Sequence, residues 1–267
     1  MNIRLLASVA AISLTCGTAQ AQQFGAWGDA EAVTSVGGGG CPILDPYTND
    51  LFIASGRDGG FGSNDIWRAP YNGSGWDAAV NVGPTINTAA PEYCPSPARG
   101  RMFFFVRSGD IYMSKVHPKN GYGAPVALSD EINAADEWSP TYLEDDEDTS
   151  YLYFSSDRDG TQDIYVSVDF GTPTKIVELS SDDGTETRPN VRRDRLELVY
   201  DDGAGNIYFS SRESTDDPWG PPVLFTKGNG SRASFSWDGM TLVWGDGGTI
   251  MKSTRSKLAK LKMVDTP

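Results

Sequence analysis

The sequence predicts an all-β fold, a five-bladed β-propeller, and an internal repeat is the main observation behind this prediction. The segment that opens at Ser139-Pro140 recurs as five imperfect copies, whose starts lie 53, 45, 49 and 45 residues apart. Each copy consists of short runs rich in Val, Ile, Tyr, Phe and Trp, separated by Gly, Asp, Asn and Ser, as strands and hairpin turns require. A repeat of this length built from short strands is typical of a propeller blade. The copies open at Cys41, Cys94, Ser139, Arg188 and Ala233.

Each complete copy is predicted to contain four strands. The first is short and follows the opening proline, as at 141–143. A polar turn leads to the second strand, which is the most β-prone run of the copy, and a Gly/Asp loop precedes the third. The second strands are predicted at 51–54, 102–106, 151–154, 196–200 and 241–244, the third at 65–67, 110–113, 163–166, 206–209 and 249–251, and the fourth at 79–82, 125–128, 175–179 and 222–225.

The two ends of the repeat region complement each other. Residues 27–36 match the fourth-strand pattern although no first three strands precede them, and the fifth copy has three strands but no fourth. We therefore expect residues 27–36 to supply the outer strand of the fifth blade. This pairing closes the ring and leaves no sheet edge open to further strands.

Residues 1–21 have the pattern of a secretory signal peptide. Arg4 provides the positive start, an apolar run follows, and Ala19-Gln20-Ala21 is a small-x-small cleavage site. A lipid anchor on Cys16 is the alternative, but the residues before this cysteine do not suit lipid attachment, so we expect cleavage after Ala21. The prediction is a signal peptide over 1–21, a propeller over 22–255 and a basic C-terminal tail over 256–267, in a protein of the periplasm or the cell exterior.

The chain is strongly acidic, with 22 Lys and Arg against 36 Asp and Glu and a net charge of −14. Removal of residues 1–21 takes away one Arg and no acid, which leaves −15. Such a field repels a phosphate backbone, so nucleic acid is not an expected partner. No apolar run approaches the roughly 20 residues of a transmembrane helix. We expect a monomer that does not insert into the membrane.

Cys41 and Cys94 are the two cysteines that remain after cleavage, and an even number in an exported chain favours a disulfide. Each precedes the proline that opens its copy, so the two occupy equivalent positions in neighbouring blades. Equivalent residues at the start of the innermost strands converge near the propeller axis. We therefore predict a Cys41–Cys94 disulfide, with a metal-binding thiol pair or two inert thiols as the alternatives.

The segment Glu137-Trp-Ser-Pro140, followed by residues 152–160 and by Asp163-Ile-Tyr165, resembles the WD-repeat-like propeller repeats of TolB-type exported bacterial proteins. The resemblance extends over nearly all of the chain after residue 21 and is weakest in the fifth copy. TolB-type proteins carry an additional N-terminal domain and six blades, and this sequence predicts neither. The resemblance implies a fold and an exported location. It implies little about function, since propellers host binding, catalysis and scaffolding alike.

Loops of one kind gather on one face of a propeller. We name the face that carries the fourth-to-first and second-to-third strand connections the entry face, and the opposite face the hairpin face. Glu92, Glu137 and Glu186 fall on the entry face, each two residues before its Cys, Ser or Arg, with Gly39 and Ser231 as their equivalents in the first and fifth copies. The other residues expected there, as a binding face, are Arg57, Asp58, Phe61, Tyr93, Trp138, Arg158, Asp159 and Arg188.

The three glutamates support two interpretations. Carboxylates at a suitable separation are the minimum apparatus of glycoside hydrolysis, and some five-bladed propellers are glycosidases. Residues that recur at the same position of each repeat more often stabilise the fold than act in a site. We therefore favour a structural role, in which the glutamates pair with the loop arginines. No catalytic residue is therefore assigned, and Glu92, Glu137 and Glu186 are candidates only.

Other catalytic or metal sites have weaker support. His117 is the only histidine and lies in a turn, so neither a Ser-His-Asp triad nor a histidine zinc site is expected. The acidic run 144–148 lacks the spacing of a calcium loop, although its carboxylates suit a hard cation. We expect a solvated hairpin tip and no cofactor, with calcium as the minority alternative.

These observations favour an exported binding or scaffold protein that presents one channel-mouth face to a protein, peptide or glycan partner. Aromatic and arginine side chains beside a channel mouth are the residue types enriched at recognition hot spots. The alternative is a carbohydrate-active enzyme, a glycoside hydrolase or lyase, that uses the same face.

Overall fold

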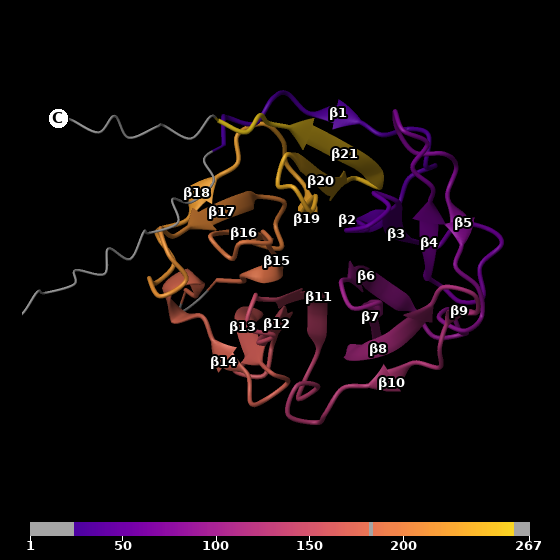
Figure 1. Ribbon diagram of the computed structural model, residues 1–267, viewed down its shortest axis with the longest axis horizontal. Coiled ribbons are helices and arrows are strands. Elements are labelled where there is room, and N and C mark those ends of the chain that lie inside the picture. The colour runs from indigo at the N-terminus through magenta and orange to yellow at the C-terminus, as the bar shows by residue number, and fades with distance from the viewer. Residues whose placement is uncertain (1–23, 182–183, 259–267) are drawn as a thin grey trace, which may run out of the picture.

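The computed structural model describes residues 24–181 and 184–258, which form five antiparallel sheets around a central axis (Figure 1). The predicted five-bladed propeller is confirmed. The signal peptide expected over 1–21, with Cys16, and most of the tail expected over 256–267 lie outside the described residues. No helix in the described part of the chain is long and apolar enough to cross a membrane.

Each blade runs from an inner strand at the axis to a short outer strand (Figure 1). The strands of the first blade are β2 (Gly40–Leu44), β3 (Leu51–Ser55), β4 (Asp65–Ala69) and β5 (Val80–Asn81); of the second, β6 (Glu92–Ala98), β7 (Met102–Arg107), β8 (Asp110–His117) and β10 (Val126–Ala127), with β9 (Gly121–Tyr122) beside β8; of the third, β11 (Glu137–Glu144), β12 (Ser150–Ser156), β13 (Asp163–Val168) and β14 (Thr174–Lys175); of the fourth, β15 (Thr187–Val191), β16 (Glu197–Asp201), β17 (Ile207–Ser211) and β18 (Val223–Leu224); and of the fifth, β19 (Ser231–Phe235), β20 (Thr241–Asp246), β21 (Thr249–Thr254) and β1 (Glu31–Ala32). A single turn of 3₁₀ helix, η1 (Val177–Leu179), follows β14.

The N-terminal strand occupies the outer edge of the fifth blade. β1 pairs antiparallel with β21, with Glu31 opposite Lys252. Backbone hydrogen bonds extend this contact on both sides, from Gly28 N–H to the carbonyl of Thr254 and from Val33 N–H to the carbonyl of Ile250. The first and last described segments therefore lie side by side in one sheet (Figure 1).

The core is divided among the interfaces between neighbouring blades. Five clusters of buried side chains fill these interfaces, and each draws mainly on the second and third strands of two adjacent blades. Phe105 and Trp244, for example, are fully buried between blades one and two and between blades four and five. Burial of each such side chain stabilises the fold by about 1.5–3 kcal/mol, so the blades hold one another in place.

Every inner strand contains a β-bulge at the same position. One residue of each strand has a positive φ, and the strand register shifts around it. A bulge turns the local backbone and redirects a side chain, and these five residues line one small cavity at the axis. The residues, named here the axial ring, are Cys41 (φ 47°), Cys94 (47°), Ser139 (48°), Arg188 (57°) and Arg232 (59°).

The axial ring corrects the predicted register of the fifth copy. The fifth copy opens at Arg232, one residue before the predicted Ala233, and Gly230 takes the place that the prediction gave to Ser231. In the other four copies a proline follows the ring residue, whereas the fifth copy has Ala233 at this position. The predicted start of the fifth copy was therefore one residue too late. The aspartates in the turn between the first and second strands also indicate Arg232 as the start of the fifth copy. Asp145, Asp194 and Asp238 each lie six residues after a ring residue.

Candidate functional site

The entry-face glutamates are buried and engaged within their own blades. Glu92 is fully buried and accepts hydrogen bonds from the backbone N–H (3.0 Å) and the hydroxyl (2.6 Å) of Thr88. Arg107 forms an ion pair with the same carboxylate, and its Nε lies 2.8 Å from Oε1 of Glu92. Glu186 accepts from the N–H and hydroxyl of Ser181. Both carboxylates therefore hold the loop that leads into their blade.

Glu137 of the third blade, like Glu92, accepts from a backbone N–H, a hydroxyl and an arginine. Its Oε1 accepts from the N–H of Ala135 (3.0 Å), the hydroxyl of Ser156 (3.0 Å) and Nη2 of Arg158 (3.2 Å). Its Oε2 is buried without a hydrogen-bond partner among the described residues. Burial raises the pKa of Glu137 to about 7, in opposition to the hydrogen bonds from Ser156 and Ala135 and to the charge of Arg158.

This pKa predicts a stability difference between the wild type and Glu137→Gln. A pKa raised from the ordinary 4.5 contributes stability that is present below that value and is lost as the pH rises through 7. Between about pH 4.5 and 7.5 the free energy of unfolding of the wild type should therefore fall by about 3 kcal/mol relative to that of the uncharged Glu137→Gln variant. Urea unfolding of both proteins across this range measures the difference, and parallel stability curves would contradict the assignment.

The loop arginines of the entry face are also part of the scaffold. Arg57 donates to the carbonyls of Val36 and Gly38, and Arg158 donates to the carbonyls of Glu131 and Ile132. Each guanidinium lies over an aromatic ring of its own blade, Trp67 in the case of Arg57, at 5.0 Å from the centroid. Their N–H groups donate to the preceding loop and hold it in place. Fewer of these donors are therefore free to bind a partner molecule.

The other predicted binding-face residues are spread over different environments. Phe61 (49% exposed), Asp58 and Asp159 are exposed, and Asp159 also accepts a hydrogen bond from the hydroxyl of Tyr165. Tyr93 and Trp138 are half-buried next to the ring residues Cys94 and Ser139, and their ring centroids are 5.4 Å apart. Arg188 points from the ring to Asp201, which it binds through Nε and Nη2.

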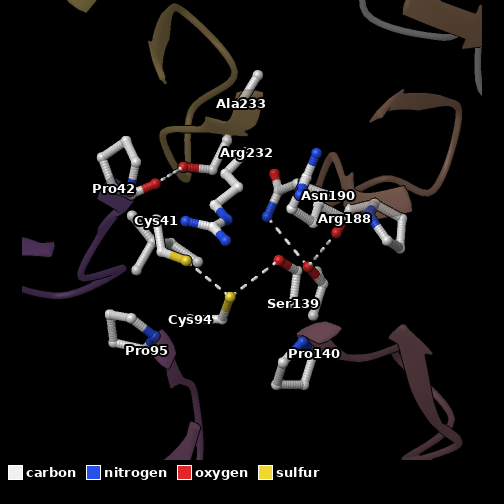
Figure 2. A pocket seen from close by; sticks show the side chains of 14 residues that line it. Cys41, Pro42, Cys94, Pro95, Ser139, Pro140, Arg188, Asn190, Arg232 and Ala233 are labelled. Atoms are coloured by element: carbon white, nitrogen blue, oxygen red, sulfur yellow. Dashed lines mark hydrogen bonds between the residues drawn. The ribbon is translucent and has the colours of Figure 1, made fainter. Parts of the chain in front are cut away.

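Cys41 and Cys94 lie side by side in the axial ring (Figure 2). Their Sγ atoms are 2.7 Å apart, and the hydroxyl of Ser139 donates to Sγ of Cys94 at 3.3 Å. The predicted convergence of the two cysteines is present. The predicted disulfide is not shown by this structure, in which both are free cysteines whose sulfurs lie farther apart than the roughly 2.0 Å of an S–S bond.

Arg232 provides the positive charge of the ring. Figure 2 shows its guanidinium beside Cys41, pointing into the middle of the ring. Burial alone would raise the pKa of Cys94, but the hydrogen bond with Cys41, the charge of Arg232 and the hydroxyl of Ser139 outweigh it and lower this pKa to about 6. Burial and the neighbouring Cys94 raise the pKa of Cys41. The pair is therefore poised to share a single proton near neutral pH.

Three neighbouring cavities, which share lining residues, lie between the hairpin face and the axial ring. The outer cavity, named here the hairpin-face cleft, has a volume of about 450 Å³, and it shares Tyr142 and Trp237 with a middle cavity of about 50 Å³. The middle cavity shares Thr141 and Asn190 with an inner cavity of about 30 Å³, which the axial ring lines. The axis is thus a funnel that narrows towards the two thiols.

Two arginines and a tryptophan dominate the hairpin-face cleft. The guanidinium carbons of Arg99 and Arg193 lie 4.1 and 5.1 Å from the ring centroid of Trp237. Both arginines are exposed, and neither has a carboxylate partner among the described residues. The indole N–H of Trp237 is buried and has no acceptor within the described part of the chain. Sequence reasoning missed this cleft because it placed the binding surface on the entry face, although Trp237-Asp-Gly239 was a visible remnant of the repeat.

The acidic run 144–148 and His117 lie in or beside hairpin turns. In the acidic run, Asp145 accepts backbone hydrogen bonds from Glu147 and Thr149, as a hairpin tip requires. His117 ends β8 and pairs with Gly121 across a turn. Within residues 24–181 and 184–258, no group of three or more His, Cys, Asp or Glu side chains is arranged to hold a metal ion.

Known structures share this architecture. No family model matches the sequence, and no curated protein is significantly similar to it. TolB from Acinetobacter baumannii is 15% identical, with a TM-score of 0.51 over 81% of this chain and 54% of that chain. The catalytic domain of a GH62 α-L-arabinofuranosidase from Coprinopsis cinerea is 12% identical, with a TM-score of 0.59 over 86% and 96% of the two chains. An endo-1,4-beta-xylanase from Bacteroides thetaiotaomicron is 14% identical, with a TM-score of 0.53 over 86% and 93%.

These similarities show the fold alone. They confirm the resemblance to TolB-type propellers as a resemblance of fold, and this chain spans about half the length of the TolB chain that it matches. The same fold occurs in glycoside hydrolases. A propeller can serve either purpose, so the function has to be argued from the axis and its two mouths.

Proposed function

We propose that this chain is an exported, monomeric binding protein that presents the hairpin-face cleft to a carboxylate-bearing peptide segment of a partner. The observation that carries the proposal is the pair of guanidinium groups, Arg99 and Arg193, that flank Trp237 without a carboxylate partner among the described residues. An arginine with free donors binds a carboxylate through two parallel hydrogen bonds.

The charges of the cleft support a peptide ligand. Two of its acids are matched within the protein, since Asp145 pairs with Arg195 at 3.4 Å and Asp194 with Arg192 at 2.8 Å. Glu144 accepts a hydrogen bond from Tyr142 and is exposed. Glu144 and Asp146 also line the cleft without an ion-pair partner among the described residues, so the cleft has unmatched charges of both signs. Arg99 and Arg193 are its unmatched cations, and they flank Trp237, which favours an anionic group beside this ring.

The aromatic residues of the cleft support the same interpretation. Trp237 is half-exposed and Tyr142 lines the inner wall, so an apolar side chain can pack where the cleft narrows. Trp, Tyr and Arg are the residue types enriched at interface hot spots. The buried indole N–H of Trp237 lacks an acceptor from the described residues, and a ligand carbonyl could provide one.

The enzymatic alternative places chemistry on the entry face. Glu92, Glu137 and Glu186 each accept hydrogen bonds within their own loops, which favours the scaffold role.

The cleavage pattern of residues 1–21 supports export.

A ligand screen tests the proposal. Arrays of peptides with free C-terminal carboxylates, and of neutral and acidic glycans, are probed with the wild type and with Arg99→Ala/Arg193→Ala. We expect the wild type to retain carboxylate-bearing peptides and the double variant to lose them, because each lost charged hydrogen bond costs about 1.5–3 kcal/mol. Retention of glycans with release of a shorter product, abolished by Glu137→Gln, would instead establish the hydrolase alternative.

A further inference from the structure

The inner end of the axial funnel brings together groups that bear on sulfur chemistry. Two thiols, one hydroxyl and one guanidinium meet there from four different inner strands. The Sγ atoms of Cys41 and Cys94 are in contact at 2.7 Å, so a reaction at one sulfur takes place beside the other. This arrangement is independent of any ligand in the hairpin-face cleft.

The guanidinium of Arg232 has no carboxylate partner among the described residues, and its Nε is buried without a hydrogen-bond acceptor. Its ring neighbour Arg188 differs, because Asp201 binds Arg188 through both carboxylate oxygens. Arg232 is half-buried, and a partly desolvated positive charge is stabilised by an anion nearby. Asp201, whose carboxylate accepts the backbone N–H of Arg232, and the two thiols of the ring are the groups that can supply one.

The hydrogen bonds single out Cys94 as the thiolate. Ser139 donates to its Sγ, and Cys41 can donate from the other side. Two donors and one cation stabilise the anionic form of a thiol, and the thiolate is the nucleophile in cysteine chemistry. Cys41, which has no second donor described, is the thiol that remains protonated beside it.

The size of the cavity limits what can react. The inner cavity of about 30 Å³ has room for about one or two water molecules. Cys41 and Cys94 are only 4% and 2% exposed. A protein thiol or a bulky reagent does not reach these sulfurs, whereas a reactant close to water in size can enter.

We propose that Cys94 and Cys41 form a hydrogen-peroxide-reactive dithiol at the propeller axis, with Arg232 as the positioning residue that stabilises the attacking thiolate. The Cys94 thiolate attacks one peroxide oxygen, so that an S–O bond forms, the O–O bond breaks and hydroxide leaves to take a proton from solvent. The Cys41 sulfur then attacks the sulfenic sulfur, the S–S bond forms, the S–O bond breaks, and the departing hydroxide takes the Cys41 proton. Two sulfurs together lose two electrons, the peroxide gains two, and two waters result.

Intact mass spectrometry of the fully reduced, full-length protein tests the proposal. Hydrogen peroxide should remove two hydrogens from the wild type and protect both thiols from alkylation, whereas tert-butyl hydroperoxide should react at least roughly tenfold more slowly because of its size. Cys41→Ser should accumulate a sulfenic acid at Cys94, seen as a gain of one oxygen in mass and labelled by dimedone once denaturant has unfolded the protein, and Cys94→Ser should not react.

Two variants separate the role of Arg232 from folding. Arg232→Gln should slow oxidation at pH 7 by about two- to tenfold, because a rise of one to two units in the Cys94 pKa leaves only about half to a tenth of this thiol as thiolate. Arg232→Lys keeps the charge and should retain a rate within a few-fold of the wild type. Equal rates for the two hydroperoxides, or equal rates for the wild type and both Arg232 variants, would overturn the proposal.

Discussion

Asp201→Ala should lower the free energy of unfolding by about 3–5 kcal/mol, the typical cost of removing one partner from a buried ion pair. Asp201 is fully buried and accepts from Nε of Arg188 at 2.9 Å. It also accepts the backbone N–H of Arg232 at 2.9 Å and that of Gly203 at 3.0 Å. One carboxylate thus joins the inner strands of the fourth and fifth blades at their bulges. Alanine leaves a guanidinium and two backbone donors without their acceptor.

Guanidinium chloride unfolding measures this loss. Asp29→Ala is the matched control, because Asp29 pairs with Lys227 at the fully exposed surface (93% exposed side chain) and should leave the unfolding midpoint unchanged. A small effect for Asp201→Ala, equal to that of the control, would show that the blades do not depend on this carboxylate.

Arg255→Ala should have the second-largest effect, also about 3–5 kcal/mol of unfolding free energy. The Arg255 side chain is 5% exposed and makes two hydrogen bonds to Glu197, of 2.9 and 2.6 Å. Its guanidinium carbon lies 4.2 Å from the ring centroid of Trp27. Arg255 therefore connects the end of β21 both to the fourth blade and to the N-terminal segment beside β1.

Thermal and denaturant unfolding of Arg255→Ala should show reduced stability, with β1 exposed to hydrogen exchange earlier than the other outer strands. Lys252→Ala in the same strand is the control. Its partner Glu31 is 69% exposed, so the pair contributes well under 1 kcal/mol. Equal protection of β1 in Arg255→Ala and Lys252→Ala would contradict the role assigned to Arg255.

Much of the fold follows from the repeat. Alternating β-branched and aromatic residues mark the second and third strands of every blade, because these strands fill the interfaces between blades and have little freedom in composition. The outer strands are short and exposed, as at Val126–Ala127 and Val223–Leu224. Only their place in the repeat makes them predictable.

The site was predictable only in part. The convergence of Cys41 and Cys94 follows from their equivalent places in the repeat, and so does the pairing of Glu92 and Glu137 with loop arginines. Arg232 was missed because Ala233 stands where the other copies have proline. The hairpin-face cleft was missed because the binding surface was expected on the opposite face, although the repeat encodes this cluster. Arg99, Arg193 and Trp237 each lie five residues after a ring residue, so the three side chains meet at the same mouth of the axis.

The location of the binding surface is the central claim, and calorimetric titration of one carboxylate-bearing peptide from the array tests it most directly. Wild type, Arg99→Ala/Arg193→Ala and the entry-face variant Phe61→Ala are compared under the same conditions. We expect the double variant to bind at least about tenfold more weakly, which corresponds to about 1.4 kcal/mol or more, and Phe61→Ala to match the wild type. Loss of binding in Phe61→Ala with full affinity in the double variant would place the surface on the entry face and contradict the proposed function.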